Sequence, residues 1–130
     1  MAKMNGIYQS DDWKTEKHVP VIEIKGNVEE GEEIEVMASV GKEIAHPNTT
    51  EHHIEWIELY FHPEGEKFPY ELGRFEFRSH GASGEGPDTS TVYTEPKIKA
   101  VFKTEKPGTI IASSYCNIHG LWTDEKELKL

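Results

Sequence analysis

The feature that most constrains the fold of this chain is a set of short segments in which apolar and polar residues alternate. In the stretch 33–40 every second side chain is apolar, and these residues are Ile34, Val36, Ala38 and Val40. Successive side chains of a β-strand point to opposite faces, so the pattern predicts a strand with one buried face. No apolar period of 3.6 residues persists for three helical turns in the 130-residue sequence. We therefore expect an all-β fold.

Six further segments have the composition of strands and are separated by turn residues. They are 19–25, 54–61, 70–78, 91–94, 98–103 and 109–116. Short strands at this spacing are typical of antiparallel sandwiches, and we predict an immunoglobulin-like β-sandwich of about seven strands. The Gly- and Ser-rich stretch 79–88 is expected to be a loop. A short helical turn is expected near Trp13, with Ser10 or Asp11 as its N-cap.

Length and charge narrow the class of protein further. A chain of 130 residues suits one domain covering residues 1–130. The formal net charge of −10, without any run of Lys and Arg, argues against a nucleic-acid partner. No segment has the ~20 apolar residues of a membrane span, and the first residues lack the apolar stretch of a secretory signal. We therefore expect a cytoplasmic protein without a membrane partner.

The side chains best suited to metal binding or catalysis are one cysteine and seven histidines. Cys116 is the only cysteine, which excludes an intramolecular disulfide and a four-cysteine metal site within this chain. The histidines are His18, His46, His52, His53, His62, His80 and His119. Imidazole suits iron, copper, zinc and nickel, and a thiolate adds a soft, strongly donating ligand.

Taken singly, each of these residues has an ordinary structural explanation. A lone cysteine is more often a small buried side chain than a ligand, and a histidine in a turn needs no special reason. His52 and His53 are adjacent, so in an extended backbone they point to opposite faces and at most one joins a given site. Cys116 and His119 are three positions apart after a strand, which suits paired metal ligands. The combination across three segments, and no single residue, favours a metal site.

Those three segments resemble one known family. They are EKHVP at 16–20, HPNTTEHH at 46–53 and SYCNIHGLW at 114–122. In composition and order they closely resemble the superoxide reductases, also called neelaredoxins, and the resemblance covers essentially the whole chain. The family has an immunoglobulin-like β-sandwich, in agreement with the fold predicted above from the strand pattern.

The resemblance implies a role for seven residues around a single iron ion. His18, His46, His52 and His119 would be equatorial ligands, and Cys116 would be the axial thiolate. It also implies that Glu16 can bind the opposite axial position in the oxidised state, and that Lys17 is a catalytic cation. The other three histidines (His53, His62 and His80) fall outside the implied ligand set.

The resemblance also implies a reaction and partners. The family reduces superoxide by one electron to hydrogen peroxide at one Fe²⁺/Fe³⁺ ion per subunit. With a single cysteine, the chain resembles the single-iron type, which lacks the N-terminal four-cysteine iron domain. Such proteins take electrons from an external donor, typically rubredoxin, and are commonly homotetramers. We therefore expect electron transport from such a donor and an oxidative stress defence role.

Charge and ligand chemistry suit that reaction. Ferrous iron with four neutral imidazoles and one thiolate keeps a net positive charge, so it attracts an anion locally inside an acidic protein. Glu16 binding on oxidation would compensate the added charge. The thiolate pushes electron density through the metal. Backbone N–H groups around Ile118 and His119 are expected to point at the Cys116 sulfur and tune its donor strength.

Three other functions deserve comparison. A blue-copper electron carrier normally has a weak axial Met after the second His, whereas all three methionines here precede Cys116. A zinc-binding module prefers four ligands, and this chain offers five and an optional carboxylate. Superoxide dismutation needs the oxidised form to accept an electron from a second superoxide, which a strong thiolate donor disfavours.

Overall fold

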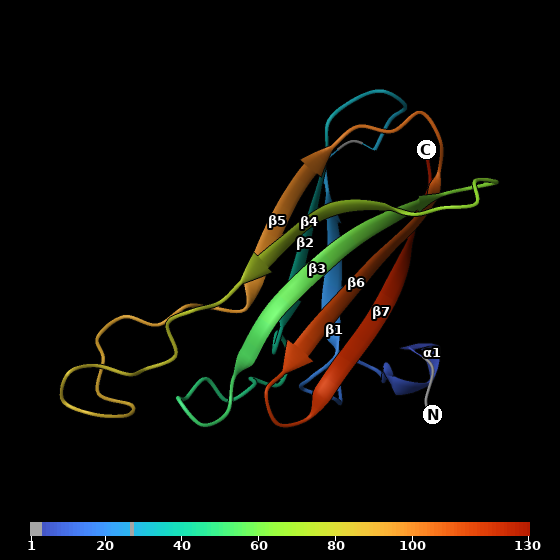
Figure 1. Cartoon of the computed structure of the whole chain (residues 1–130). Helices are drawn as coiled ribbons and strands as arrows, with labels where there is room; N and C mark the ends of the chain where they lie inside the picture. The colour runs from blue at the N-terminus through green and yellow to red at the C-terminus, as the bar shows by residue number, and fades with distance from the viewer. Residues whose placement is uncertain (1–3, 27) are drawn as a thin grey trace.

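The computed structural model describes residues 4–26 and 28–130, and seven strands form most of it (Figure 1). One short helix, α1 (Met4–Ile7), precedes them. The strands are β1 (Pro20–Lys25), β2 (Ile34–Val40), β3 (Ile54–Pro63), β4 (Tyr70–Glu76), β5 (Lys97–Phe102), β6 (Gly108–Cys116) and β7 (Gly120–Leu128). They form a three-stranded sheet in the order β1-β2-β5 and a four-stranded sheet in the order β4-β3-β6-β7, with antiparallel pairing throughout.

The core lies between the two sheets, where their inward side chains meet. In β2, Ile34 and Val36 are fully buried, as the alternating pattern predicts. From the other sheet, Leu59 of β3 and Ile110 of β6 are also fully buried. Burial of this apolar area is the main driving force for closing the sandwich. The predicted immunoglobulin-like, all-β fold is confirmed.

Six of the seven predicted strands are confirmed, with boundaries shifted by at most two residues. The predicted strand at 91–94 is wrong: of its residues, only Tyr93 pairs at all, in an isolated bridge to His80. Val92 and Tyr93 are 70% and 57% exposed, so these β-prone side chains have no sheet to pack against. They belong to the long segment between β4 and β5, which extends away from the sandwich in Figure 1. The loop expected at 79–88 lies in the same segment and contains no strand.

The strand β7 was not predicted. It is an edge strand of the four-stranded sheet, and its second half is a run of charged, mostly exposed residues. Only Trp122 and Leu128 are buried in it, so the sequence carries almost no alternation of apolar residues. Backbone pairing with β6 along all nine positions makes it a strand nevertheless.

The helical turn near Trp13 is confirmed, but its N-cap is Asp12 and not Ser10 or Asp11. The amides of Thr15 and Glu16 both donate to the Asp12 carbonyl at 2.9 Å, and Asp12 Oδ1 accepts from the amide of Lys14 at 3.0 Å. A side-chain oxygen that satisfies an amide of the first turn is what defines an N-cap. Among the described residues, no helix is long and apolar enough to span a membrane.

Candidate metal centre

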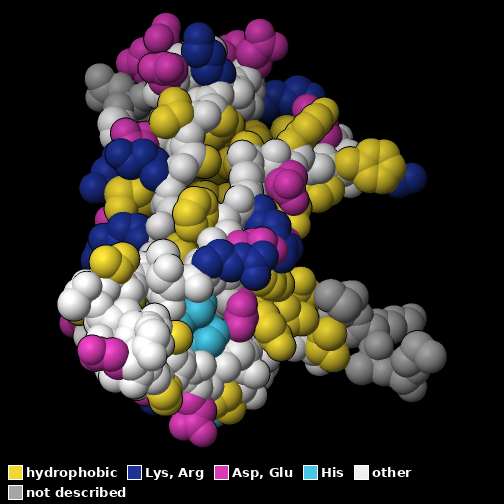
Figure 2. Space-filling model, turned by 60° about the vertical axis from the view of Figure 1, so that its left-hand side comes forward, with side chains coloured by type: hydrophobic (Ala, Val, Ile, Leu, Met, Phe, Trp, Pro, Cys, Tyr) yellow, Lys and Arg dark blue, Asp and Glu magenta, His cyan; other side chains and the backbone are white. Residues whose placement is uncertain are grey.

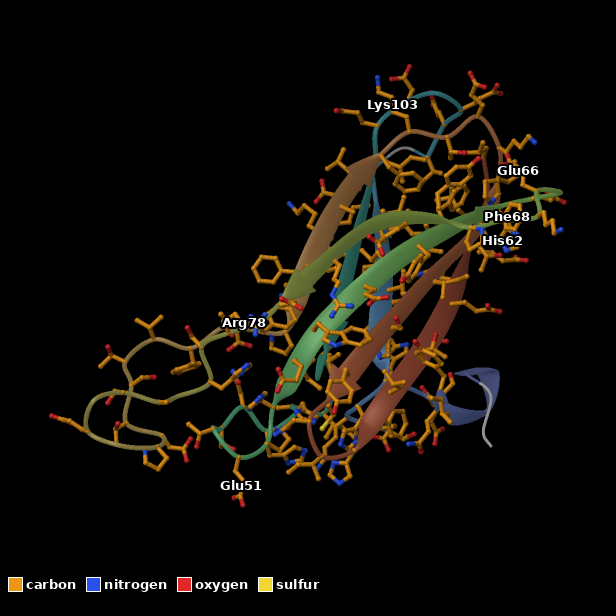
Figure 3. All side chains as sticks on the ribbon, viewed as in Figure 1. Glu51, His62, Glu66, Phe68, Arg78 and Lys103 are labelled. Atoms are coloured by element: carbon orange, nitrogen blue, oxygen red, sulfur yellow. The ribbon has the colours of Figure 1, made fainter. Side chains whose placement is uncertain are left out.

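Five of the implied ligands meet at one end of the sandwich, around the C-terminal end of β6. Cys116 is the last residue of β6, and His119 lies in the tight turn between β6 and β7. His18 precedes β1 by two residues, His52 precedes β3 by two, and His46 lies in the loop between β2 and β3. Figure 3 shows nitrogen-bearing ring side chains gathered at this end of the molecule. The fold therefore brings together side chains from three separate chain segments.

The atoms that face one another are four ring nitrogens and one sulfur. His18 Nε2 lies 3.0 Å from His119 Nδ1, which lies 3.2 Å from His52 Nε2. Cys116 Sγ lies 3.8 Å from His119 Nδ1 and 3.5 Å from His46 Nε2. Donor atoms of His18, His52, Cys116 and His119 all lie within 4.8 Å of one another. The ring of His46 completes the group, with its centroid 4.7 Å from that of His52.

These separations fit donors that share one metal ion. Two nitrogens bound at right angles to an ion about 2.1 Å away lie about 3 Å apart. Imidazole and thiolate together suit iron, copper or zinc and do not suit Mg²⁺ or Ca²⁺. Five donors also exceed the four of a closed structural zinc site. The donor set therefore fits a single redox-active ion such as iron.

Two hydrogen bonds fix the tautomers that such an ion needs. The Glu16 carboxylate accepts from His18 Nδ1 at 2.5 Å and from the His18 amide at 2.9 Å. The Pro47 carbonyl accepts from His46 Nδ1 at 2.6 Å. Each ring thereby carries its proton on Nδ1 and turns the lone pair of Nε2 toward the centre. Partners of this kind orient metal-binding histidines and raise their basicity.

Burial and nearby positive charge lower the pKa values of two of the imidazoles, those of His46 and His52. Burial lowers the pKa of His46 to about 4, and the charges of His18, His52 and Lys17 add to that effect. The pKa of His52 is lowered by burial and then by His119, His18 and Lys17. Neutral imidazole is the form that binds a metal. The lowered pKa values therefore favour the metal-binding form of His46 and His52.

The sulfur is the most deeply buried donor, and the centre reaches the surface at His119. Cys116 has no exposed surface and His18 is 7% exposed, whereas His119 is exposed. The amide of His119 donates to Cys116 Sγ at 3.4 Å, as expected. In the described part of the chain no such bond comes from the amide of Ile118. One of the two expected backbone donors is therefore confirmed.

Glu16 and Lys17 lie beside this centre, outside the group of converging donors. The Glu16 carboxylate is held on His18 Nδ1, on the side of that ring away from the other imidazoles. Burial would raise the pKa of Glu16, but the hydrogen bonds from His18 outweigh it and hold that pKa below its usual value. Lys17 is half-buried, and its charge depresses the pKa values of His46 and His52.

Two residues that support the centre were not found from the sequence. Trp122 stacks on His18 with ring centroids 5.1 Å apart, and its Nε1 donates to the His119 carbonyl at 3.2 Å. Asn117 accepts from the His53 amide at 2.9 Å and donates to the Glu51 carbonyl at 2.8 Å. Asn117 thereby ties the loop of His52 to the turn of His119. Both residues stand in the SYCNIHGLW segment, next to the predicted ligands, and that position was the only available signal.

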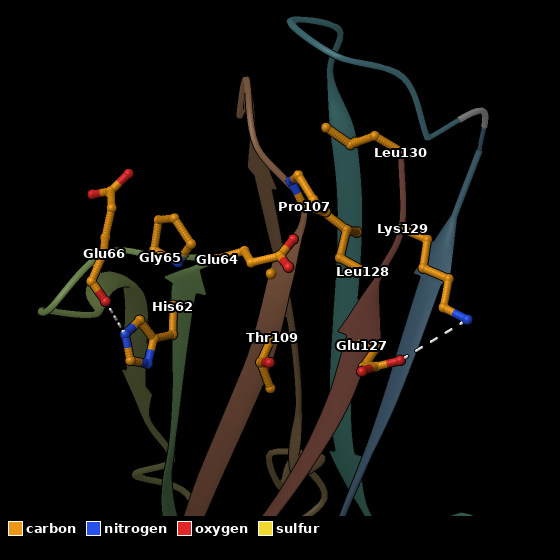
Figure 4. Close-up of a pocket in the computed structure, with 12 residues that line it drawn as sticks. His62, Glu64, Gly65, Glu66, Pro107, Thr109, Glu127, Leu128, Lys129 and Leu130 are labelled. Atoms are coloured by element: carbon orange, nitrogen blue, oxygen red, sulfur yellow. Dashed lines mark hydrogen bonds and ion pairs between the residues drawn. The ribbon is translucent and has the colours of Figure 1, made fainter.

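The remaining histidines lie elsewhere. His53 points away from His52, as predicted for adjacent residues, and its ring stacks on His80 at 3.5 Å between centroids. His62 borders a cavity of about 600 Å³ where β6 begins, at the opposite end of the sandwich, and its Nε2 donates to the Glu66 carbonyl (Figure 4). That large cavity is therefore not part of the metal centre.

Fold and site together define a class: β-sandwich metalloproteins with a mononuclear centre of histidine and cysteine ligands. Within that class, residues 10–125 match the desulfoferrodoxin family model. The chain is 61% identical over 121 residues to a superoxide reductase of Pyrococcus furiosus, covering 93% of this chain and 95% of the relative. It is 53% identical over 128 residues to a neelaredoxin of Megalodesulfovibrio gigas, covering 98% of each.

A solved structure agrees with these relatives. The superoxide reductase of Archaeoglobus fulgidus in its reduced form superposes with a TM-score of 0.90 at 62% identity, covering 95% of this chain and 99% of that one. The chain belongs to the desulfoferrodoxin family, and the resemblance found from the three sequence segments is confirmed.

Proposed function

We infer that this chain is a superoxide reductase, an oxidoreductase that converts superoxide, one electron and two protons into hydrogen peroxide. One observation carries the inference: four imidazole nitrogens and the Cys116 sulfur converge at one end of a sandwich whose relatives carry that name. The cofactor is one iron ion, which supplies the one-electron change between its ferrous and ferric states.

We propose that His18, His46, His52, His119 and Cys116 hold this iron. The support is their convergence and the preset tautomers of His18 and His46. A divalent ion with four neutral imidazoles and a thiolate keeps one net positive charge. Charges that are close together and poorly screened interact more strongly than distant ones. The positive centre therefore attracts superoxide despite the acidic surface. The exposed His119 edge leaves that small anion a direct approach.

The reaction itself is the first test of the proposal. The protein is reduced without oxygen and given superoxide, and hydrogen peroxide and oxygen are both measured. We expect peroxide without oxygen release, whereas oxygen release would indicate dismutation. Metal analysis should give about one iron per chain, together with a visible thiolate-to-iron charge-transfer band. A colourless zinc protein would contradict the inference.

We propose that Glu16 binds the oxidised iron in addition to orienting His18. The two roles are separable, because glutamine still accepts a hydrogen bond from His18 Nδ1 but is a poor ligand. If Glu16 binds iron, Glu16→Ala and Glu16→Gln should both shift the visible absorption of the oxidised protein at neutral pH. A shift in Glu16→Ala alone would mean that the carboxylate only positions His18.

We propose that Lys17 attracts superoxide and holds the water that delivers protons. Its charge already acts on His46 and His52. Lys17→Ala should slow the reaction with superoxide by roughly 10-fold at low ionic strength, with less effect in high salt. Stopped-flow mixing measures the rate, and Lys14→Ala in the preceding turn is the matched control. Loss of iron from Lys17→Ala, or an unchanged rate, would contradict the proposal.

We propose that an external donor, rubredoxin or a similar protein, re-reduces the iron. The centre lies within reach of such a donor because His119 is exposed at the surface. The neighbouring Ile118 is also 53% exposed. Reduced rubredoxin should be oxidised in the presence of the protein and superoxide, at a rate that depends on both proteins.

We propose that the chain forms one domain and assembles as a homotetramer. The single core supports one domain, and exposed Phe75, Tyr70 and Val101 on β4 and β5 offer apolar surface for assembly. Light scattering on the purified protein should give four times the chain mass. A reduced, buried thiol suits a reducing compartment, so we place the protein in the cytoplasm.

A further inference from the structure

We propose that His53, Glu55 and His80 form a second metal site, separate from the His/Cys centre, for a divalent ion such as zinc. One ligand atom from each of these residues lies within 4.8 Å of the others. His53 and Glu55 flank the start of β3, and His80 follows β4. Figure 2 shows histidine side chains reaching the surface of one face of the sandwich beside an acidic side chain.

The first support is an unsatisfied nitrogen on His80. Its Nε2 donates to the Phe77 carbonyl at 2.6 Å, which places the ring proton on Nε2. Nδ1 therefore carries a lone pair, and it is the one buried side-chain nitrogen or oxygen of the described residues without a hydrogen-bond partner. An unmatched buried acceptor costs free energy, so such atoms call for an explanation. A bound cation supplies one.

The second support is the pairing of His53 with Glu55. His53 Nδ1 donates to the Thr49 carbonyl at 2.8 Å, which leaves Nε2 as the ring nitrogen that faces Glu55. Nε2 lies 2.8 Å from Glu55 Oε1, a distance at which the carboxylate holds either the proton of an imidazolium or a cation shared with the ring. His53 is only 7% exposed. The potential ligand atoms of His53, Glu55 and His80 thus gather within 4.8 Å of one another, and Nδ1 of His80 has no hydrogen-bond partner.

The arrangement has the features of a built metal site. Both imidazoles give their remote N–H to a backbone carbonyl, which is how metal-binding histidines are usually oriented. Two histidines and one glutamate are a ligand set that zinc uses, with water in the fourth position. Burial lowers the pKa of His80 and thereby favours its neutral, metal-binding form.

Metal entry requires the two rings to leave their stacked arrangement. The planes of His53 and His80 are 6° apart and stacked. Nitrogen lone pairs lie in the ring plane, so the rings must open relative to each other for both to bind one ion. His80 stands in the long segment between β4 and β5, where it forms an isolated bridge to Tyr93. An ion bound there would fasten this segment to the strand that follows the His52 loop.

Zinc uptake by the iron-loaded protein tests the site. The protein with one iron per chain is dialysed against Zn²⁺, and both metals are then quantified. We expect about one zinc per chain with iron unchanged, and a higher midpoint of thermal unfolding with zinc. His80→Phe keeps a stacking ring but removes Nδ1, and Glu55→Gln keeps the shape but removes the charge. Both should fall to background zinc, whereas the control His62→Phe should keep it.

Cobalt distinguishes the two sites, because only the first contains sulfur. Co²⁺ bound to His53, Glu55 and His80 should give weak visible bands without a thiolate charge-transfer band in the near ultraviolet. The proposal is overturned if the iron-loaded protein takes up no zinc, or if either variant binds as much as the wild type. It is equally overturned if Co²⁺ produces a thiolate band while iron is released. The iron spectrum and the peroxide assay are read in the same samples, so loss of the reductase function would be seen separately.

Discussion

Replacing Cys116 with serine is expected to abolish the reduction of superoxide while the sandwich stays folded. The sulfur is the only soft donor of the centre, and it is fully buried at the end of β6. A serine hydroxyl has a similar size but does not ionise at pH 7, so the charge and the electron donation of the thiolate are both lost. Loss of a partner that only orients a ligand costs about 10–100-fold in metal affinity or activity. Loss of this direct ligand should therefore cost more than ~100-fold.

Three measurements follow the Cys116→Ser variant. The charge-transfer band should disappear, peroxide formation should fall to background, and circular dichroism should remain that of the parent. Ser113→Ala is a matched control, because Ser113 is buried in the same strand and is not a candidate ligand. A coloured, active serine variant would mean that the sulfur does not bind the iron.

Leu59→Ala is expected to lower the free energy of unfolding by about 2–5 kcal/mol. Leu59 is fully buried at the middle of β3, which pairs with both β4 and β6. Truncation removes apolar contacts and leaves a cavity, because strands on both sides prevent the core from closing over it. Since β3 follows directly from the His52 loop, looser packing should also weaken iron retention on heating.

Chemical denaturation of the iron-free protein measures this loss without a contribution from metal binding. Val92→Ala in the segment between β4 and β5 is the control, because Val92 is 70% exposed and its truncation should change stability by less than about 0.5 kcal/mol. A loss of under 1 kcal/mol for Leu59→Ala would show that the core can collapse around the smaller side chain.

The sequence predicted most of the fold where one face of a strand is buried. In β2, alternation of apolar residues matches burial as far as Ala38, because one face of the strand packs on the core. The prediction from sequence missed a strand that is stabilised by backbone pairing and not by side-chain burial. This strand is β7, which pairs with β6 although its second half is charged. The prediction also failed at 91–94, where Val92 has strand propensity but no neighbouring strand. β-Propensity expresses fit to a sheet surface, and a sequence does not show whether that surface exists.

For the site, the sequence predicted which residues would gather, and the structure adds how they are held. His18, His46, His52, His119 and Cys116 were singled out by type and by family resemblance, and they do meet. Most of the contacts by which Trp122 and Asn117 orient these ligands join residues that are far apart in the sequence. The same is true of the pair His53 and His80, which are 27 positions apart in the printed sequence. Contacts between residues so far apart depend on the order of the strands in the sheets, and the local sequence carries no pattern that predicts them.

The separation of the ligands along the chain also determines when the centre can form during folding. His18 and His119 are 101 positions apart, yet their ring nitrogens lie 3.0 Å from each other. Contacts this distant in sequence form late, since closing so long a loop costs entropy before any contact repays it. A partly folded chain cannot present the five donors together, so it cannot capture iron at this centre. Iron content would then report on completed folding, and newly made protein should acquire its colour only after both sheets have closed.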